Sequence, residues 1–304
     1  DHEDGSATLS GVPSYNPESQ NSPIKLRAFT LEGGFEDIDI FYQVSESLVS
    51  KMGNDNLPET FSAITLHGQI NPAGLVGLDI AKVGLYGSFK GEVEMDSNSL
   101  ISDGKTNGFF LIAENNGTIA DSIHFSSSDR VFLRDSVLAP SGKFYVLGNF
   151  SGVLEVAGFS TVSRGGNDLF LAEFDSSGSL LNLLSYGGSG DELAGGLALN
   201  EDLLFVSGSF WGTTTVGSFT LPSNGKQDAV LFCVLLDQLG SVQWAKSYGG
   251  TDIDSFLDLS VSSKGKIFAL GNYQNSLEVA GKTLISEGDG SFLLKLDPNG
   301  IESN

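Results

Sequence analysis

A short apolar stretch that ends in Gly-x-Phe or Gly-x-Tyr recurs along this chain. Its glycines are Gly87, Gly148, Gly208 and Gly271, which lie 61, 60 and 63 residues apart. A fainter copy, Leu9-Ser10-Gly11, precedes them. A fixed period of this size means that one supersecondary unit is used repeatedly, so it constrains the architecture before any local preference is considered.

Within each period the same short segments recur in the same order. Each is apolar, or alternates between apolar and polar residues, and is bounded by Gly, Asn, Asp or Ser. This pattern is typical of strands and turns, and no stretch shows a convincing helical period. In the third complete repeat the predicted strands are 193–199, 203–210, 229–236 and 241–248. The sequence therefore predicts four antiparallel strands per repeat.

A turn that begins with Asp and ends with Gly follows the predicted third strand of each later repeat. These turns are 175–178, 237–240 and 297–300. The Asp side chain can accept hydrogen bonds from the amides of its own turn, and Gly can adopt the positive φ that closes a hairpin. The pattern favours neighbouring strands joined by tight connections.

Four antiparallel strands repeated radially are typical of a β-propeller, whose blades bury the apolar faces of their neighbours. We predict an all-β protein that forms a single propeller domain over residues 1–304, with about five blades, the terminal ones incomplete. An open stack of small sheets is the competing architecture. The predicted repeats are 1–53 (partial), 61–125, 132–188, 193–250 and 255–300 (partial).

Both terminal repeats lack strands. The last one stops where its fourth strand should begin, and 7–11, 38–44 and 48–52 resemble second, third and fourth strands without a first. Either the chain is a piece of a longer propeller or a neighbouring molecule completes the missing strands, because proteins normally cover unpaired strand edges.

Three stretches interrupt the repeats. Residues 14–25 hold two of the eight prolines and are predicted to form a flexible loop or linker. Residues 52–59 and 68–77 lengthen the first complete repeat and are predicted to be inserted loops, where binding functions often lie.

The repeat resembles the SBBP type of bacterial β-propeller repeat. The residues that carry the resemblance are Asp168, Phe170, Leu171, Asp175, Gly178 and the run Trp-Ala-Lys-Ser-Tyr-Gly-Gly at 244–250. The resemblance is good over 133–300 and weaker over 68–125, where Phe125-Ser126-Ser127 replaces Tyr-Gly-Gly. It implies a secreted or cell-surface scaffold, and it supplies no catalytic residues.

The chain is strongly acidic. Asp and Glu total 38 against 16 Lys and Arg, which gives a net charge of −22. Such a charge disfavours nucleic acid and anionic membranes as partners and is compatible with cations or basic proteins. The single cysteine, Cys233, excludes an intrachain disulfide and lies in an apolar run too short to span a membrane, so membrane insertion is not expected.

Few residues suggest catalysis. The three histidines are His2, His67 and His124, and no nucleophile elbow or zinc spacing accompanies them. Because a triad can assemble from distant residues, a hydrolase that uses His67 or His124 stays a third hypothesis. Both histidines are otherwise ordinary strand residues.

Calcium is the cofactor that the acidic turns would suit best. The candidate ligands are Asp191, Asp252, Asp254 and Asp289, which lie in turns rich in Gly and carbonyl groups. Calcium takes six to eight oxygen ligands, but none of these turns matches an EF-hand. The alternative role for these carboxylates is to accept hydrogen bonds from turn amides.

Aromatic residues recur after the second predicted strand and could line a sugar site. They are Phe150, Phe210, Trp211 and Tyr273. A repeated aromatic residue at a blade edge can stack on sugar rings, but it can equally pack between blades.

Together these features predict a non-enzymatic, extracellular or cell-surface module with a structural or adhesive role. Its partners would be other proteins or surface glycans, and its incomplete terminal blades could join copies of the chain into a surface assembly. The alternative function is that of a carbohydrate-binding, lectin-like propeller.

Overall fold

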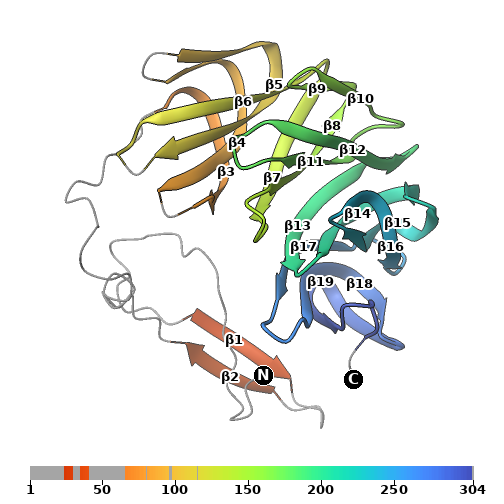
Figure 1. Ribbon diagram of the computed structural model, residues 1–304. Coiled ribbons are helices and arrows are strands. Elements are labelled where there is room, and N and C mark those ends of the chain that lie inside the picture. Colours follow the sequence, from red (N-terminus) through yellow and green to blue (C-terminus); the bar gives the residue numbers. More distant parts are fainter. Residues whose placement is uncertain are drawn as a thin grey trace, which may run out of the picture. The chain divides into compact units, whose positions relative to one another are not determined.

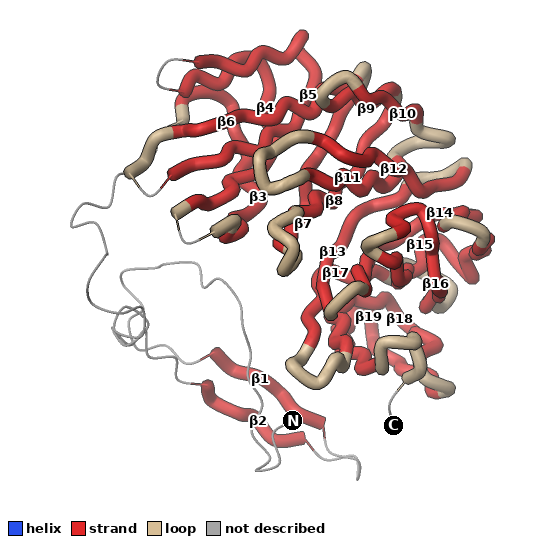
Figure 2. Tube along the Cα trace, in the orientation of Figure 1, coloured by secondary structure: helices blue, strands red, loops and turns tan. Residues whose placement is uncertain are grey.

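The computed structural model describes residues 24–29, 35–40, 66–79, 81–95, 98–114 and 116–302 (Figure 1). All regular structure in these residues is β-strand, which confirms the predicted all-β class (Figure 2). Accordingly, the described residues include no helix able to cross a membrane. The chain divides into two compact units, Asp1–Leu57 and Pro58–Asn304.

The N-terminal unit contains a hairpin of two antiparallel strands. In it β1 (Ile24–Phe29) pairs with β2 (Phe35–Ile40). Residues 24 and 25, predicted as the end of a linker, therefore belong to a strand, and the rest of that linker lies outside the described residues. The strands predicted at 7–11 and 48–52 also lie outside them, whereas β2 includes residues 38–40 of the strand predicted at 38–44.

The C-terminal unit is built from four successive groups of antiparallel strands, here called sheets 1 to 4. Sheet 1 consists of β3 (His67–Gly77), β4 (Lys82–Met95), β5 (Asn98–Glu114) and β6 (Ile119–Ser127). Sheet 2 consists of β7 (Arg130–Leu138), β8 (Phe144–Ser151), β11 (Asp168–Phe174) and β12 (Leu180–Gly188), with the hairpin β9 (Val153–Val156) and β10 (Phe159–Val162) beside it.

Sheets 3 and 4 follow the same order of pairing. Sheet 3 consists of β13 (Glu192–Asn200), β14 (Leu203–Val216), β15 (Phe219–Leu235) and β16 (Gln238–Tyr248). Sheet 4 consists of β17 (Ser255–Val261), β18 (Ile267–Val279) and β19 (Lys282–Leu296). A bridge between Glu302 and Leu296 lies beyond the turn that follows β19.

Each sheet is also linked to the next at one recurring place. The end of the fourth strand pairs with the outer part of the next sheet, and these links join β3 to β16 into one 14-stranded sheet. The linked pairs are Phe125 with Val156, Gly187 with Thr215, and Gly249 with Glu278.

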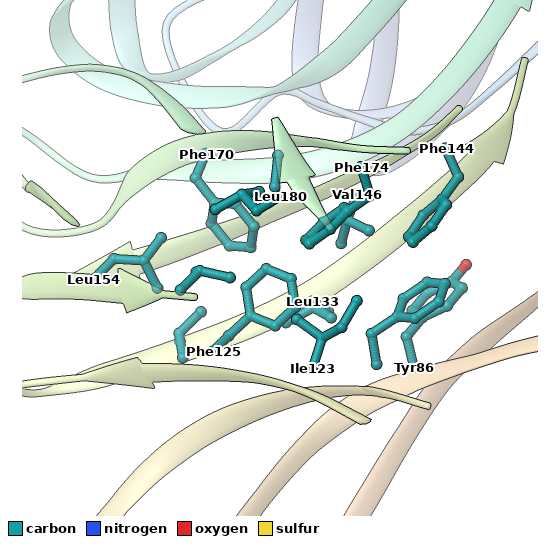
Figure 3. Packing of buried hydrophobic residues seen from close by; sticks show 14 of the residues in the cluster. Tyr86, Ile123, Phe125, Leu133, Phe144, Val146, Leu154, Phe170, Phe174 and Leu180 are labelled. Carbon is teal, nitrogen blue, oxygen red and sulfur yellow. The ribbon is translucent and has the colours of Figure 1, made fainter. Parts of the chain in front are cut away.

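The successive sheets pack face to face through three apolar clusters. The cluster between sheets 1 and 2 contains Phe110 of β5, whose ring stacks on Phe144 of β8 at 4.9 Å between centroids. Phe144 in turn stacks on Phe174 at the same distance. Figure 3 shows Phe144 and Phe174 among the side chains of this cluster. Comparable clusters join sheet 2 to sheet 3 and sheet 3 to sheet 4. Each fully buried Phe stabilises this packing by roughly 1.5–3 kcal/mol.

The central sheets and the last sheet differ in how their faces are covered. In β11 every residue is buried, because sheet 2 has a neighbour on both faces. In sheet 4 burial alternates along the strands: Ala269 is buried, whereas Leu270 and its cross-strand partner Leu293 are 44% and 65% exposed.

Three local predictions need correction. Residues 68–77, predicted as an inserted loop, lie in β3, where Pro72 is tolerated because it stands at a register shift in an edge strand. The strand predicted to end at Phe210 continues as β14 to Val216, since the supposed excursion is a paired hairpin. The turn predicted at 237–240 is shorter, because β16 already begins at Gln238.

Candidate functional site

The first strands of sheets 2, 3 and 4 lie side by side and carry register shifts at matching places (Figure 1). Arg134, the extra residue in β7, donates from Nε to the Gly195 carbonyl (3.1 Å) and from Nη2 to the Leu257 carbonyl (3.3 Å). Its neighbour Asp135 accepts from the Leu197 amide (2.7 Å) and from the Tyr86 hydroxyl (3.3 Å). Two adjacent residues of sheet 2 thus contact sheets 1, 3 and 4.

An open pocket of about 540 Å³ lies where the same three strands end. Its walls combine aliphatic side chains with the hydroxyl, amide and carboxyl groups of short turns. It is lined by 137–140, 199–201 and 261–263. No His, Cys, Lys or Arg lines this pocket, and its polar side chains are those of Asn200, Glu201 and the serines at 262 and 263.

Buried carboxylates mark the second junction, between sheets 2 and 3, and the third, between sheets 3 and 4. Asp168 accepts from the Arg164 amide (3.1 Å), and Asp228 accepts from the Asn224 amide (2.9 Å). Both are fully buried, and burial raises the pKa of each. A Cβ on Gly187 or Gly249 would lie 2.3 Å from the carboxyl carbon of its partner, which explains the first Gly of the Tyr-Gly-Gly motif.

A second carboxylate accompanies each of these. Glu192 lies near Asp168, and Asp254 lies near Asp228. Burial, reinforced by the neighbouring charge, raises the pKa of Glu192 to about 7 and that of Asp254 to about 6. Asp254 accepts from the Gly250 amide at 2.7 Å, yet one oxygen of each of Asp168, Asp228 and Asp254 makes no hydrogen bond among the described residues.

The first junction, between sheets 1 and 2, is built differently. The strand register places Asn107 where Asp168 and Asp228 stand, each opposite the aromatic residue of the Gly-x-Phe motif. Val131 lies opposite Phe150 in sheet 2, and Glu192 lies opposite the corresponding Phe210 in sheet 3, so Val131 occupies the position of Glu192. The first junction therefore carries no carboxylate at either position.

His124 occupies the first junction beside Asn107. The Asn107 side chain accepts from the Ser127 amide (3.4 Å) and contacts His124 Nε2 through its Nδ2 atom (2.9 Å). This orientation makes Nε2 the acceptor and leaves the ring proton on Nδ1. Burial lowers the pKa of His124, so the ring is neutral at physiological pH.

A second cavity, of about 400 Å³, opens beside His124. It lies between the end of β6 and the β9–β10 hairpin, which pair with each other. The lining residues are His124, Ser126 and 155–160. Departures from the repeat had been visible at Ser126 in the sequence, but their connection to Asn107 and to the hairpin required the strand pairing.

The four predicted calcium ligands are spread over different turns and already accept protein donors. Asp191 accepts from the Asn167 amide (2.8 Å), Asp252 from Lys226 (2.9 Å) and Asp289 from Gln274 (3.2 Å). Among the residues that the structure describes, no three acidic, His or Cys side chains are grouped to hold a metal ion. Calcium binding stays a prediction.

The predicted aromatic platform is not a surface feature. Phe150, Phe210 and Tyr273 are buried in the clusters that join successive sheets, one in each cluster. These rings cannot stack on a sugar, because the preceding sheet already covers them. Trp211 is partly exposed and donates its backbone amide to the Asp191 carbonyl (3.0 Å).

The other residues singled out by the sequence lie apart from both cavities. His67 is exposed at the start of β3. Cys233 is fully buried between sheets 3 and 4, where burial raises the pKa of its thiol to about 12. Its thiol therefore belongs to the apolar core, as the surrounding run of apolar residues predicts.

No protein-family model matches this chain, and a search of curated proteins found no match either. The resemblance to SBBP-type repeats therefore stays a prediction that rests on the residues named above.

Proposed function

We propose that this protein is an extracellular, non-enzymatic β-propeller scaffold that associates with further copies of itself. The proposal is supported by face-to-face packing of four consecutive sheets, by the radial arrangement that the Arg134 and Asp135 contacts favour, and by the acidic composition. The SBBP resemblance supports a secreted or cell-surface location.

The observation that carries self-association is a face of sheet 4 that no other sheet within the described residues 66–302 covers. Counting from the recurring Gly, Leu270 and Leu293 stand where Leu147 and Leu171 stand in sheet 2. In sheet 2 these positions are buried under sheet 3. The same positions in sheet 1 are Tyr86 and Phe110, which are buried under sheet 2.

A second copy of this chain is the occupant that we propose for this face. In sheets 1 to 3 the equivalent face is covered by the sheet that follows in the chain, which is built from the same repeated unit. A second copy of the chain carries sheets of this kind. Each copy carries a net charge of −22, so association should strengthen as salt screens the repulsion.

Sedimentation velocity over graded protein and salt concentrations tests this role. Wild-type protein is expected to associate increasingly with concentration and salt, and Leu293→Asp should abolish this by placing a charge on the apolar face. Ile285→Asp is the matched control, because Ile285 lies on the same strand and is 79% exposed but belongs to the outer hairpin. A strictly monomeric wild type, or equal loss in both variants, would contradict the proposal.

A further inference from the structure

The largest departure from the repeat coincides with a cavity. At the first junction Ser126 and Ser127 replace the two glycines, Asn107 replaces the buried Asp, and His124 lies beside it. Places where a repeated pattern breaks without a gain in packing are candidates for function. Here a space of about 400 Å³ lies beside the break, within the range of roughly 300–1,000 Å³ typical of small-molecule sites.

The wall formed by the β9–β10 hairpin is held rigidly. Ala157 and Gly158 both have positive φ, at 48° and 85°, as a tight two-residue turn requires. Strand β9 pairs with β6, so that Ser126 lies opposite Glu155. This arrangement presents Phe159, which is 46% exposed, at the cavity without further rearrangement of the backbone.

The lining of this cavity combines one aromatic ring with neutral polar groups and a single carboxylate. One partly exposed aromatic ring, Phe159, supplies an apolar face, while Ser126, Ser160 and His124 supply neutral hydrogen-bonding groups. Glu155 is the single charged side chain, and no Lys or Arg is among the lining residues. An anionic ligand would meet a carboxylate with no compensating cation, and a lipid chain would meet too little apolar surface.

We propose that this cavity binds a neutral sugar residue, with one face of the sugar ring against Phe159 and its hydroxyl groups hydrogen-bonded to Glu155 and His124. Sugars combine an apolar C–H face with a rim of hydroxyls, which matches one aromatic ring bordered by acceptors and donors. The neutral His124 ring, with its proton on Nδ1, offers a donor without adding a charge. Sugar binding at this site is independent of self-association through sheet 4.

Saturation-transfer NMR on the full chain tests the site. The probes are glucose, galactose, mannose, N-acetylglucosamine, N-acetylgalactosamine and their disaccharides, with sialic acid as an anionic probe. At least one neutral sugar is expected to receive saturation and to shift the His124 ring resonances, while sialic acid should not bind. Phe159→Ala should weaken the affinity about fivefold, which corresponds to the loss of an aromatic contact worth about 1 kcal/mol.

Two comparisons keep the result interpretable. Phe132→Ala is the matched control, because Phe132 is 38% exposed on β7 and does not line the cavity; it should bind like wild type. Glu155→Gln is a second variant in the lining of the cavity. Because Glu155 is exposed, this substitution should leave the fold intact, so a loss of binding in it cannot be attributed to unfolding. The proposal is overturned if no neutral sugar binds, if sialic acid binds equally well, or if Phe159→Ala and Phe132→Ala behave alike. Running all samples in the Leu293→Asp background separates this outcome from any failure of self-association.

Discussion

The first junction between sheets and the two later junctions use the same backbone arrangement with opposite side-chain chemistry. The later ones bury the carboxylate pairs Asp168–Glu192 and Asp228–Asp254 against glycine backbone. The first one buries the neutral Asn107, bonded to His124, and leaves a cavity. The difference teaches that the glycines and acids of the repeat pack together as one unit, and that the junction that lacks them has a cavity beside it.

The carboxylates of the later junctions lower the stability of the fold, because buried carboxylates are destabilising unless they are hydrogen-bonded or protonated. Backbone amides four residues earlier satisfy one oxygen of Asp168 and of Asp228, and proton uptake is the remaining way to relieve the charge. The neutral first junction needs no such relief, so the two kinds of junction should respond differently to substitution and to pH.

Exchanging the residues of the two kinds of junction should have the largest effect. At Gly188 a Cβ would lie 1.8 Å from the Thr213 carbonyl oxygen, so Gly188→Ser must push β14 away from β12. We expect a loss of about 3 kcal/mol in the free energy of unfolding. At the corresponding place in the first junction the reverse exchange, Ser127→Gly, creates no clash. It removes the hydrogen bonds that the Ser127 hydroxyl donates to the Ser151 carbonyl and accepts from the Asp129 amide, and should cost about 1–2 kcal/mol.

Urea denaturation of both variants measures these costs. Equal losses in the two variants would mean that the junctions are packed alike and would remove the basis of the comparison.

The pH dependence of stability should come from the later junctions. Glu192 has a pKa of about 7 in the folded chain against an ordinary 4.5, so folding favours its protonated form. Below pH 4.5 Glu192 is protonated in both the folded and the unfolded chain, so it does not lower the stability. Between pH 4.5 and about 7 the unfolded chain releases this proton freely, whereas the folded chain can release it only by ionising a buried group. The free energy of unfolding should therefore fall by about 3 kcal/mol over this window, and Asp254 should add a similar fall that ends near pH 6.

Denaturation curves at pH 4 and pH 8 test this dependence. Glu192→Gln should match wild type at the lower pH and exceed it at the higher one, whereas Asn107→Asp should introduce the same dependence at the first junction. A wild-type profile that is flat between these values would show that the pairs do not hold protons. Adding millimolar calcium at pH 8 checks the alternative, because a cation bound between the carboxylates would restore the lost stability.

The strands were predictable because their signals are local. Apolar runs and the bounding turn residues locate β11 and the later part of β15, from residue 229 onward, and the Asp and Gly of 175–178 locate the turn after β11. The earlier part of β15, from Phe219, had no such signal. Local signals could not assign faces, which is why the sequence leaves Phe150 and Phe210 open between a sugar platform and packing between blades. Their burial depends on the preceding sheet, about sixty residues away in the sequence.

The candidate sites were predictable only in part. The sequence marks Ser126 and Ser127 as departures from Tyr-Gly-Gly, but the cavity forms only because β6 pairs with β9. Arg134 carries no signal at all, since its role comes from a register shift that places it across two neighbouring strands. Such contacts join residues far apart in the chain, and a single sequence contains no measure of them.

The exposed acidic turns should respond to pH in the opposite direction, with the smallest effect. Asp175 accepts from the side chain and amide of Ser177 and from the Ser179 amide, and these bonds lower its pKa. Its contribution is therefore complete above pH 3.8 and is lost as pH falls below that value. Asp175→Asn should reduce the loss of thermal stability in strong acid relative to wild type. An acid profile identical to that of wild type would mean that the turn bonds of Asp175 contribute nothing, and that the buried pairs alone set the pH response of the fold.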